Sequence, residues 1–288
     1  MTTSTAASNR VANMLTFDIE EWFHANYDGL EFPPYGTSHF RQNMDTILRL
    51  CRESNSKATF FTLGTIGEHY PDVVKAIVRD GHDLATHGYA HELAYKQSYQ
   101  EFKDDVKKSV DILEQLTGTK VLGYRAPSWS IVERNYHYLE ALEELGLVYD
   151  ASIFPVKTFL YGIPTAPTEV HRPVVNGRTL NLFEVPMSVT QVAGRNIGYS
   201  GGFYFRFFPR FFIQNAIRKA NREGKSSIVY LHPREVDPTE QKIELPFKER
   251  LIHYYNVGGT QRKLAKVLNS FEFTSVAEHL AQKGLLHV

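Results

Sequence analysis

The stretch Leu15-Thr16-Phe17-Asp18-Ile19-Glu20-Glu21-Trp22 is an apolar run that ends abruptly in acidic residues. Its beginning has the length and composition of a short buried strand over residues 13–17. Side chains alternate along a strand, so Asp18 and Glu20 should share one face and Glu21 should point to the other. Two convergent carboxylates at the end of a strand could hold a metal ion, or could serve separately as ligand and general base. Taken alone, the stretch is explained more simply as a solvated acidic loop.

A second stretch, Thr86-His87-Gly88-Tyr89-Ala90-His91, follows another predicted strand and favours the functional interpretation. His87 and His91 are four residues apart, and Gly88 permits a tight loop in which the two side chains converge. Neutral imidazoles suit zinc, and two histidines with a carboxylate and an open position are typical of catalytic zinc sites. Isolated pairs of this spacing are usually surface histidines. Combined with the acidic stretch, the pair predicts a metal site.

The composition limits the class of protein. The 288 residues allow one large domain or two small ones. Lys and Arg together equal Asp and Glu together, 32 of each, so the charge gives no reason to expect nucleic acid or an anionic membrane surface as partner. The single cysteine, Cys51, excludes an internal disulfide and permits a reducing compartment.

The N-terminus and the hydropathy pattern bear on location. Residues 1–12 are expected to form a disordered tail, and Met1–Arg10 lacks the apolar segment of a signal peptide. No run approaches the roughly 18 apolar residues that a transmembrane helix needs. We therefore expect a soluble protein without a transmembrane segment, cytoplasmic by default.

Strands and helices alternate along residues 13–288, which we interpret as a single domain. Capping boxes at Ser98 and Ser275 and stop signals at glycines support the helix boundaries. The predicted strands are 13–17, 57–63, 82–87, 121–124, 147–153 and 226–231. The predicted helices are 40–55, 71–80, 98–118, 134–145, 209–224, 260–269 and 275–283. Residues 169–189 differ, because they alternate apolar and polar residues around Asn176-Gly177, the signature of an antiparallel β-hairpin.

This alternation predicts an α/β fold with a parallel sheet, since each crossover helix returns the chain to the same end of the sheet. With six or seven such units, a closed or nearly closed barrel is favoured over an open, doubly wound sheet. The polar residues cluster after the carboxyl ends of strands, where the active sites of (β/α) barrels assemble. The predicted fold therefore places these polar residues where a barrel active site would lie.

Four motifs now stand in an order and spacing that resemble those of the polysaccharide deacetylases, the NodB-homology group called carbohydrate esterase family 4. They are Asp18-x-Glu20, His87-x-x-x-His91, Arg125-x-Pro127-x-Trp129 and Leu231-His232. Residues 201–206 and 231–233 resemble more narrowly the branch found with exopolysaccharide and surface-glycan biosynthesis loci. The resemblance covers residues 13–278 and implies a distorted (β/α) barrel of about seven parallel strands, here with a β-hairpin insertion.

The resemblance also implies roles for individual residues. Asp18 would be the general base, and Arg125 would pair with it and keep its carboxylate ionised. Glu20, His87 and His91 would hold a divalent metal ion, zinc being the usual metal of the family. The metal would polarise the acetamide carbonyl and lower the pKa of bound water.

Further roles follow from the same resemblance. The backbone N–H of Ser128 would help to stabilise the oxyanion, and His232 would be the general acid that protonates the leaving amine. The aspartate that orients this histidine in the family is matched only loosely, by Asp150, whose alternative role is that of a turn residue.

Some positions depart from the family pattern or have two interpretations. The metal carboxylate is a glutamate two positions after the base, so alternation favours Glu20 but leaves Glu21 open. Tyr230 replaces a leucine of the acyl pocket and should lie beside His232. Trp129 could stack on a sugar ring or pack in the core. Residues 203–212 are rich in aromatic side chains, which indicates core packing or a lip that meets a lipid-linked glycan or a partner subunit.

The function predicted from the sequence is metal-dependent hydrolysis of the N-acetyl group of an amino sugar, in a surface polysaccharide or its biosynthetic precursor. One alternative is a metal-independent hydrolase of cyclic amides or ureides on the same scaffold, and another is a catalytically silent glycan-binding protein. The intact histidine pair disfavours the first, and the presence of Asp18, Arg125 and His232 disfavours the second. The sequence leaves open the sugar, the linkage, the polymer length and the oligomeric state.

Overall fold

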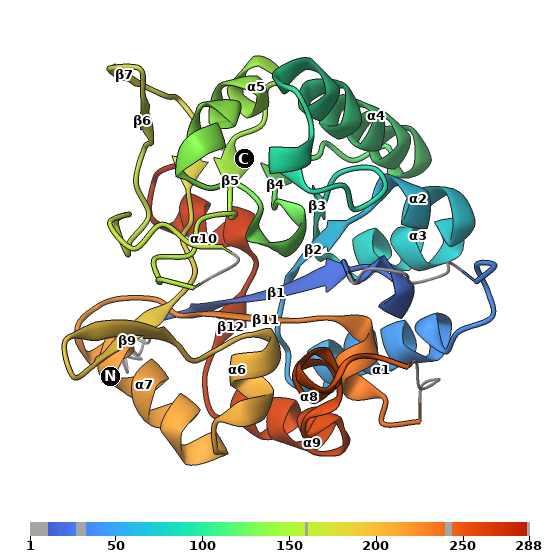
Figure 1. Ribbon diagram of the computed structural model, residues 1–288. Coiled ribbons are helices and arrows are strands. Elements are labelled where there is room, and N and C mark those ends of the chain that lie inside the picture. Colours follow the sequence, from blue (N-terminus) through green and yellow to red (C-terminus); the bar gives the residue numbers. More distant parts are fainter. Residues whose placement is uncertain (1–10, 27–32, 159–160, 240–243, 287–288) are drawn as a thin grey trace, which may run out of the picture.

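A computed structural model describes residues 11–26, 33–158, 161–239 and 244–286 of the chain. Apart from residues 11 and 12, the predicted N-terminal tail lies outside these ranges. Within them, a parallel sheet of eight strands occupies the centre and helices surround it (Figure 1). None of the helices in the described ranges combines the length and the apolar character that crossing a bilayer requires.

The sheet follows the spatial order β11-β1-β2-β3-β4-β5-β8, and β12 also pairs with β1. Every pairing in this sheet is parallel. The strands are β1 (Asn13–Ile19), β2 (Thr59–Thr62), β3 (Asp83–Thr86), β4 (Gly123–Tyr124), β5 (Tyr149–Asp150), β8 (Phe183–Glu184), β11 (Ile228–Leu231) and β12 (Phe273–Thr274). Among the described residues no ladder joins β8 to β11, so the sheet is a distorted, incompletely closed barrel. The prediction of about seven parallel strands is confirmed.

The helices lie on the outside of the sheet, where their apolar faces cover it (Figure 1). They are α1 (Phe40–Glu53), α2 (Gly64–His69), α3 (Pro71–Arg79), α4 (Tyr99–Thr117), α5 (Leu139–Glu144), α6 (Gly202–Phe207), α7 (Arg210–Arg222), α8 (Phe247–Tyr254), α9 (Val257–Leu268) and α10 (Val276–Gln282). Five 3₁₀ turns accompany them within the described ranges: η1 (Trp22–His24), η2 (Ala94–Lys96), η3 (Pro127–Trp129), η4 (Glu133–Tyr138) and η5 (Pro233–Val236).

The sequence located the long helices well and the short ones poorly. The capping box at the start of α4 forms, because Ser98 Oγ accepts from the Glu101 backbone and Glu101 accepts from the Ser98 backbone. Ser275 caps α10 by accepting from the backbone of Glu278. The helix predicted at 134–145 is instead split into η4 and α5. The short helices α2, α6 and α8 were not predicted, since six to eight residues give too few turns for a clear apolar periodicity.

The predicted hairpin forms around Asn176-Gly177, both with positive φ, between β6 (Val174–Val175) and β7 (Arg178–Thr179). It is shorter than predicted, because the rest of the alternating segment supplies β8 to the main sheet. A second antiparallel pair, β9 (Val189–Val192) and β10 (Arg195–Gly198), was missed. Its turn is Ala193-Gly194, which lacks the Asn-Gly signal.

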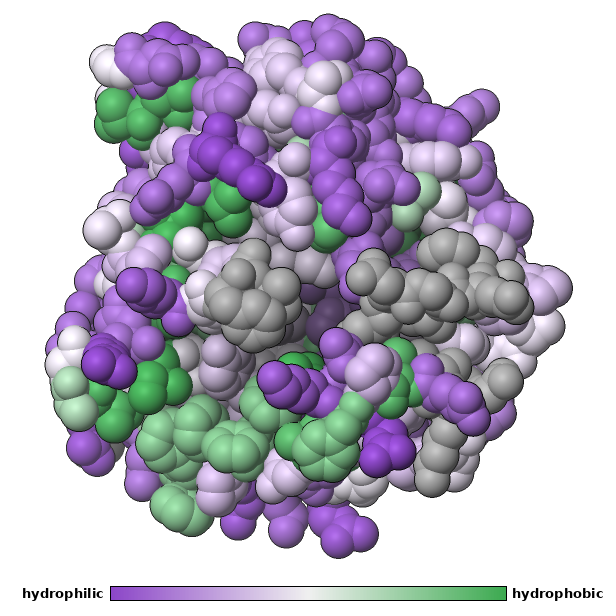
Figure 2. All heavy atoms as spheres, viewed as in Figure 1, coloured by the Kyte–Doolittle hydropathy of each residue, from purple (hydrophilic) through white to green (hydrophobic). Residues whose placement is uncertain are grey.

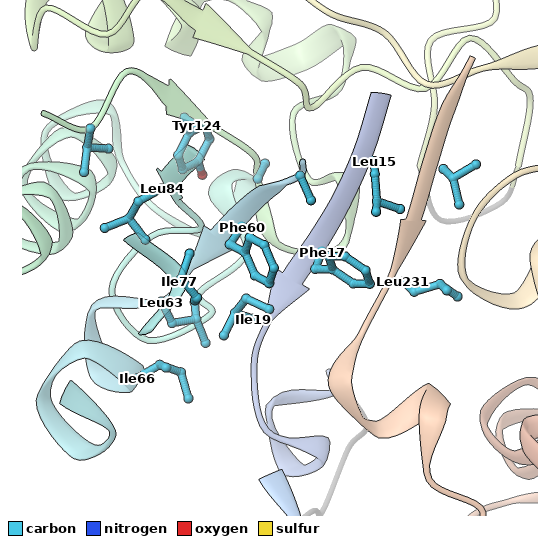
Figure 3. Packing of buried hydrophobic residues seen from close by; sticks show 14 of the residues in the cluster. Leu15, Phe17, Ile19, Phe60, Leu63, Ile66, Ile77, Leu84, Tyr124 and Leu231 are labelled. Carbon is cyan, nitrogen blue, oxygen red and sulfur yellow. The ribbon is translucent and has the colours of Figure 1, made fainter. Parts of the chain in front are cut away.

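The core has two layers because strand residues alternate. On β1, Leu15, Phe17 and Ile19 point outward and pack with side chains of β2, β11 and the surrounding helices (Figure 3). The alternate residues of β1, beginning with Met14, point into the barrel. There Met14 belongs to a second apolar cluster that includes Phe61 and Tyr230. The same alternation therefore directs Asp18 toward the barrel interior, at the carboxyl end of the strand.

Candidate active site

Three potential metal ligands converge beyond the end of β1. Glu20, His87 and His91 are all buried, and one ligand atom from each lies within 4.8 Å of the other two. Glu20 Oε2 is 2.6 Å from His91 Nε2 and 3.8 Å from His87 Nε2. His87 Nδ1 lies 2.7 Å from the carbonyl oxygen of Arg125, a contact that leaves Nε2 directed at Glu20. The arrangement suits a divalent cation such as zinc, since two imidazoles and a carboxylate leave a coordination position open.

The protonation states of these groups also suit a metal site. Burial lowers the pKa of His87 to about 4, although Asp18 opposes the shift, so the imidazole is neutral near pH 7. Burial would raise the pKa of Glu20, but His91, His232 and His87 outweigh this effect and hold it well below its usual range. A neutral imidazole and an ionised carboxylate are the forms that bind metal.

The loop between the two histidines depends on a glycine. Gly88 has φ +83°, and a Cβ there would lie 2.8 Å from Asp105 Oδ2. That carboxylate accepts a hydrogen bond from the backbone N–H of Tyr89 at 2.9 Å. His91 also has a positive φ, 62°. The tight turn that the sequence predicted is therefore present and brings His91 back beside His87.

The structure separates Glu20 from Glu21, the choice that the sequence left open. Glu21 points away from the histidines and accepts from Ser38 Oγ, at 2.8 Å to Oε1 and 2.6 Å to Oε2. The hydroxyl of Tyr70 also donates to Glu21 Oε1. Glu20 is therefore the carboxylate placed with the histidines, as strand alternation predicted.

Arg125 forms the predicted ion pair with Asp18. Its Nη1 donates to Asp18 Oδ1 at 2.7 Å and to Thr16 Oγ1 at 2.9 Å, and its Nε donates to the carbonyl of Ala151 at 3.1 Å. The guanidinium lies over the ring of Phe61, 4.0 Å from the centroid. Both charged partners are buried, so the pair holds Asp18 in one orientation at the end of β1.

The loop after β4 brings Ser128 to the mouth of the site. Ser128 is exposed and has a left-handed backbone conformation, φ 49° and ψ 31°. Asn26 Nδ2 donates to Ser128 Oγ at 3.0 Å and lies 3.2 Å from His91 Nδ1, so one amide links this loop to the histidine loop. The base of the loop is fixed by the backbone N–H of Ala126, which donates to Ser152 Oγ at 2.8 Å.

His232, directly after β11, lies on the other side of the carboxylates. Its Nε2 is 3.9 Å from Asp18 Oδ2 and 3.9 Å from Glu20 Oε1. Its Nδ1 lies 3.0 Å from Glu235 Oε2. Burial would lower the pKa of His232, but the hydrogen bond and charge of Glu235 outweigh it and raise the pKa above its usual value.

The prediction that Asp150 orients this histidine is wrong. Asp150 points to the outer side of the sheet, because its neighbours Tyr149 and Ala151 take the inward positions. Its carboxylate accepts from the Ser152 backbone at 3.2 Å and from Ser152 Oγ at 2.5 Å, and it lies beside Glu184 on β8. Glu235 occupies the place beside His232 that was predicted for Asp150.

Tyr230 and Trp129 lie together beside the site. The rings of Tyr230 and His232 are 5.7 Å apart, as predicted from their shared strand face, and those of Tyr230 and Trp129 are 5.2 Å apart. Trp129 is only 5% exposed, which corresponds to the core-packing interpretation and leaves no open ring face for a sugar. Gly201 and Gly202 lie flat against Tyr230, and a Cβ at Gly201 would be 1.7 Å from the tyrosine ring.

Glu235 and Arg206 also belong to this region, and the sequence did not identify either as a site residue. Arg206 Nε donates to Glu235 Oε1 at 2.6 Å, and both side chains are buried. A signal was present for Glu235, because its side chain accepts from the backbone N–H of His232 three residues earlier, in the manner of a capping box. Nothing in the sequence pairs Arg206 with it.

Comparison with protein families divides the chain into two segments. Residues 9–149 match the family model described as "Polysaccharide deacetylase", and residues 151–281 match one described as "Domain of unknown function (DUF3473)". In the structure both segments contribute strands to one sheet, since β1 of the first pairs with β11 and β12 of the second. The single-domain interpretation stays a prediction.

Curated relatives match less than half of the chain. The chain is 33% identical over 127 residues to "Peptidoglycan-N-acetylglucosamine deacetylase" of Bacillus cereus, covering 43% of this chain and 39% of the relative. It is 31% identical over 141 residues to "Peptidoglycan deacetylase-like protein FGM2" of Gibberella zeae, covering 45% of this chain and 41% of the relative. These alignments span about two fifths of the relatives' own lengths.

Solved structures share the fold over most of the chain. A crystal structure described as a "putative polysaccharide deacetylase from Mycobacterium smegmatis" has a TM-score of 0.59 at 18% identity, covering 98% of this chain and 94% of that one. The peptidoglycan deacetylase PdaC of Bacillus subtilis has a TM-score of 0.52 at 13% identity, covering 96% and 93%. The family match, the sequence motifs and the fold agree. Residues 9–149 therefore form a domain of the polysaccharide deacetylase family, the NodB-homology group of carbohydrate esterase family 4.

Proposed function

We propose that this protein is a metal-dependent hydrolase that removes the N-acetyl group from an amino sugar of a glycan. The observation that carries the proposal is the convergence of three functions in one place. Asp18 and Glu20 each approach His232 Nε2 to 3.9 Å, and Glu20 also contacts His91. A base, a candidate metal group and an acid therefore surround the same small volume.

The metal site is part of the proposal. Glu20, His87 and His91 would hold a divalent cation, for which zinc is our first choice, and the bound cation would supply Lewis acidity at the amide carbonyl and lower the pKa of water. The donor set supports this choice, and so does the second contact of His87 to a backbone carbonyl, which orients the ring as in known metal sites.

The chain's own residues account for the proton transfers. Asp18, held by Arg125, takes a proton from water as the water oxygen bonds to the acetyl carbon. The backbone N–H of Ser128 donates to the carbonyl oxygen while negative charge develops there. As the carbon–nitrogen bond breaks, His232 gives a proton to the departing nitrogen. The products are acetate and a free amino sugar.

The relatives support the substrate class that we propose. The B. cereus protein is named for deacetylation of N-acetylglucosamine in peptidoglycan. The resemblance of residues 201–206 and 231–233 to the exopolysaccharide branch leads us to propose a surface polysaccharide or its precursor as the substrate of this chain. The cytoplasmic location stays a prediction.

The test is incubation with oligomers of N-acetylglucosamine, followed by mass spectrometry for loss of acetyl groups and by an assay of released acetate. The assay is run on protein treated with a chelator and again after zinc is restored, with Asp18→Asn as the inactive control. We expect acetate release that requires the metal. Binding of the oligomers without release would favour the silent glycan-binding alternative. Hydrolysis that persists without metal would favour the metal-independent alternative.

The aromatic segment at residues 203–212 is only partly explained by core packing. Phe205 is buried, whereas Phe207 and Phe211 are 49% and 66% exposed. The ring of Phe207 lies 5.7 Å from that of the exposed Tyr255, and Figure 2 shows an apolar area in the lower part of the face that it presents. Contact of this area with a lipid-linked glycan or a partner subunit stays a prediction.

A further inference from the structure

The buried pair formed by Arg206 and Glu235 lies in the segment that matches the domain of unknown function. Arg206 is 1% exposed and Glu235 is 0% exposed. The Nε–Oε1 distance is 2.6 Å. A buried ion pair is retained only where the geometry and the remaining hydrogen bonds compensate for the loss of water. Both partners of this pair make further contacts that meet this requirement.

Glu235 uses its second oxygen to hold His232. Oε2 accepts from the backbone N–H of His232 at 3.0 Å and lies 3.0 Å from the ring nitrogen Nδ1. Burial would raise the pKa of Glu235, but Arg206 and His232 outweigh it and keep the carboxylate ionised. An ionised acceptor at Nδ1 requires a proton on that nitrogen. The opposite nitrogen, Nε2, is thereby fixed in the direction of Asp18 and Glu20.

Arg206 is itself fixed by the end of α8. Its Nη2 donates to the carbonyl of Ile252 at 2.7 Å, and its Nη1 donates to the carbonyls of Tyr255 at 2.7 Å and His253 at 3.3 Å. The last carbonyls of a helix have no partners within the helix and carry partial negative charge. A guanidinium placed there satisfies these carbonyls and stays in one orientation. The chain of contacts therefore runs from the end of α8 through Arg206 and Glu235 to His232.

We propose that Arg206 is a positioning residue that acts through Glu235 to keep His232 aimed at the leaving nitrogen. The DUF3473 segment then has a defined task, since it supplies the proton donor and the residues that orient it. This inference rests on the proposed function, because it assumes that His232 protonates the departing amine. Glu235, held by Arg206, takes the orienting role that the sequence had predicted for Asp150.

The competing explanation is that the pair only stabilises the packing of α6 and α8 against η5. The two explanations differ in how a substitution affects substrates with different leaving groups. An amide nitrogen leaves poorly without a proton, whereas the phenolate of an aryl acetate leaves without one. Loss of a correctly aimed acid therefore slows amide hydrolysis selectively, while a general loss of folded protein slows both reactions equally.

The experiment compares Glu235→Gln, Arg206→Met and Arg206→Lys with the unsubstituted protein on acetylated glucosamine oligomers and on an aryl acetate, with zinc bound. We expect Glu235→Gln and Arg206→Met to lower amide turnover by about tenfold to a hundredfold, the usual effect of losing a partner that orients a site residue, and to change ester turnover by much less. Arg206→Lys should restore part of the amide activity. Zinc content should match that of the unsubstituted protein.

Arg234→Gln is the matched control. Its guanidinium donates to the carbonyl of His253 at 3.2 Å, one of the carbonyls that Arg206 also contacts, but it makes no hydrogen bond to Glu235 in the described structure. We expect it to leave the ratio of amide to ester turnover unchanged. If Arg206→Met does not fold, Glu235→Gln decides alone, since it keeps the shape of the side chain.

Two results would overturn the inference. Equal losses of amide and ester turnover in Glu235→Gln would mean that the pair only stabilises packing. Loss of zinc in this variant would mean that the pair acts on the metal site and not on His232. Failure of the proposed function is distinguishable, because then the unsubstituted protein would release no acetate from the oligomers at all.

Discussion

The molecule contains two buried arginine–carboxylate pairs that can be compared directly. Arg125 holds Asp18 at 2.7 Å in the polysaccharide deacetylase segment, and Arg206 holds Glu235 at 2.6 Å in the other segment. Asp18 lies next to the proposed reaction centre, and Glu235 lies next to His232, which reaches that centre. The first pair supports the proposed base, and the second supports the proposed acid.

The pairs differ in how completely they are enclosed. Asp18 keeps one oxygen directed at the site, 3.9 Å from His232, and in the described part of the chain Arg125 Nη2 has no hydrogen-bond partner. Arg206 has donors bound to three backbone carbonyls, and both oxygens of Glu235 are in use. A carboxylate that reacts needs an open side, whereas one that only orients a neighbour can be fully surrounded.

The largest expected effect comes from removing a metal ligand, because the proposed base and the proposed acid both act beside the metal site. His87→Ala should abolish nearly all metal binding and lower turnover by roughly a thousandfold or more, since metal polarisation contributes several kcal/mol. Elemental analysis and acetate release measure the two effects. A stoichiometric metal content in this variant would contradict the ligand assignment.

Glu20→Gln and Glu21→Gln form a matched pair for the same test. Only Glu20 faces the histidines, so Glu20→Gln should lose metal and Glu21→Gln should keep it. The folding of the Glu21 variant is checked by its melting curve, because the carboxylate accepts from Ser38 and Tyr70.

The next prediction distinguishes the proposed base, Asp18, from the proposed acid, His232. Asp18→Asn should retain metal but lose roughly 100- to 10,000-fold of its turnover, on amide and ester alike, because both reactions need an activated water. His232→Ala should lose a similar factor on the amide and much less on an aryl acetate. Parallel assays on both substrates decide, and an equal loss in His232→Ala would remove that residue from the role of acid.

A smaller effect concerns the size of the acyl group. Tyr230 lies between Trp129 and His232, so Tyr230→Leu should open space there and admit propionyl groups. We expect the ratio of acetyl to propionyl turnover to fall by about tenfold, the usual scale for one methylene in a pocket. Tyr230→Phe should cost about 1 kcal/mol if the hydroxyl steadies the substrate.

Phe154→Leu is the control for this prediction, because Phe154 packs on Trp129 from another side. It should leave the acyl preference as it is. An unchanged preference in Tyr230→Leu would mean that the acyl group does not bind against this ring.

The smallest expected effect is on stability and concerns the carboxyl pair of Asp150 and Glu184, to which no arginine of the described residues donates a hydrogen bond. Burial and the charge of Asp150 raise the pKa of Glu184 well above its usual value, so the folded protein keeps a proton that the unfolded chain releases above about pH 4.5. Stability from this group is therefore complete at low pH and declines as the pH rises. Glu184→Gln should raise Tm at about pH 8, and the gain should vanish toward pH 4. Melting curves across this range test the sign, and a Tm difference independent of pH would refute it.

The sequence predicted the first pair and missed the second, for a physical reason. Asp18 lies on a long strand whose alternating pattern shows which side chains face inward. Asp150 lies on a strand of two residues that is buried on both faces, so its pattern does not distinguish inward from outward. Glu235 lies in a 3₁₀ turn, where strand alternation gives no information, although its spacing from His232 was visible.

Contacts between distant segments were the least predictable. The pairing of Arg206 with Glu235 depends on how α6 and α8 pack, and neither short helix could be recognised from periodicity. The candidate metal ligands were easier to predict, because they come from two short motifs at the carboxyl ends of strands. Glu20 follows β1, and His87 and His91 follow β3, and β2 pairs with both strands in one parallel sheet. Site residues whose positions the sheet dictates could therefore be predicted from the sequence. Those whose positions depend on loops and short helices could not.

The position of β1 has a consequence for the synthesis of the protein. This strand pairs with β11, and Asn13 accepts from the backbone of Ser227, 214 residues further along the chain. A ribosome therefore releases β1 long before its neighbour exists, and one edge of a central strand stays unpaired during most of translation. Such an edge favours association with other chains and slows folding, because distant contacts form last. The nascent chain should depend on chaperones until its final quarter emerges, and it should acquire stability and the proposed proton donor in the same late event.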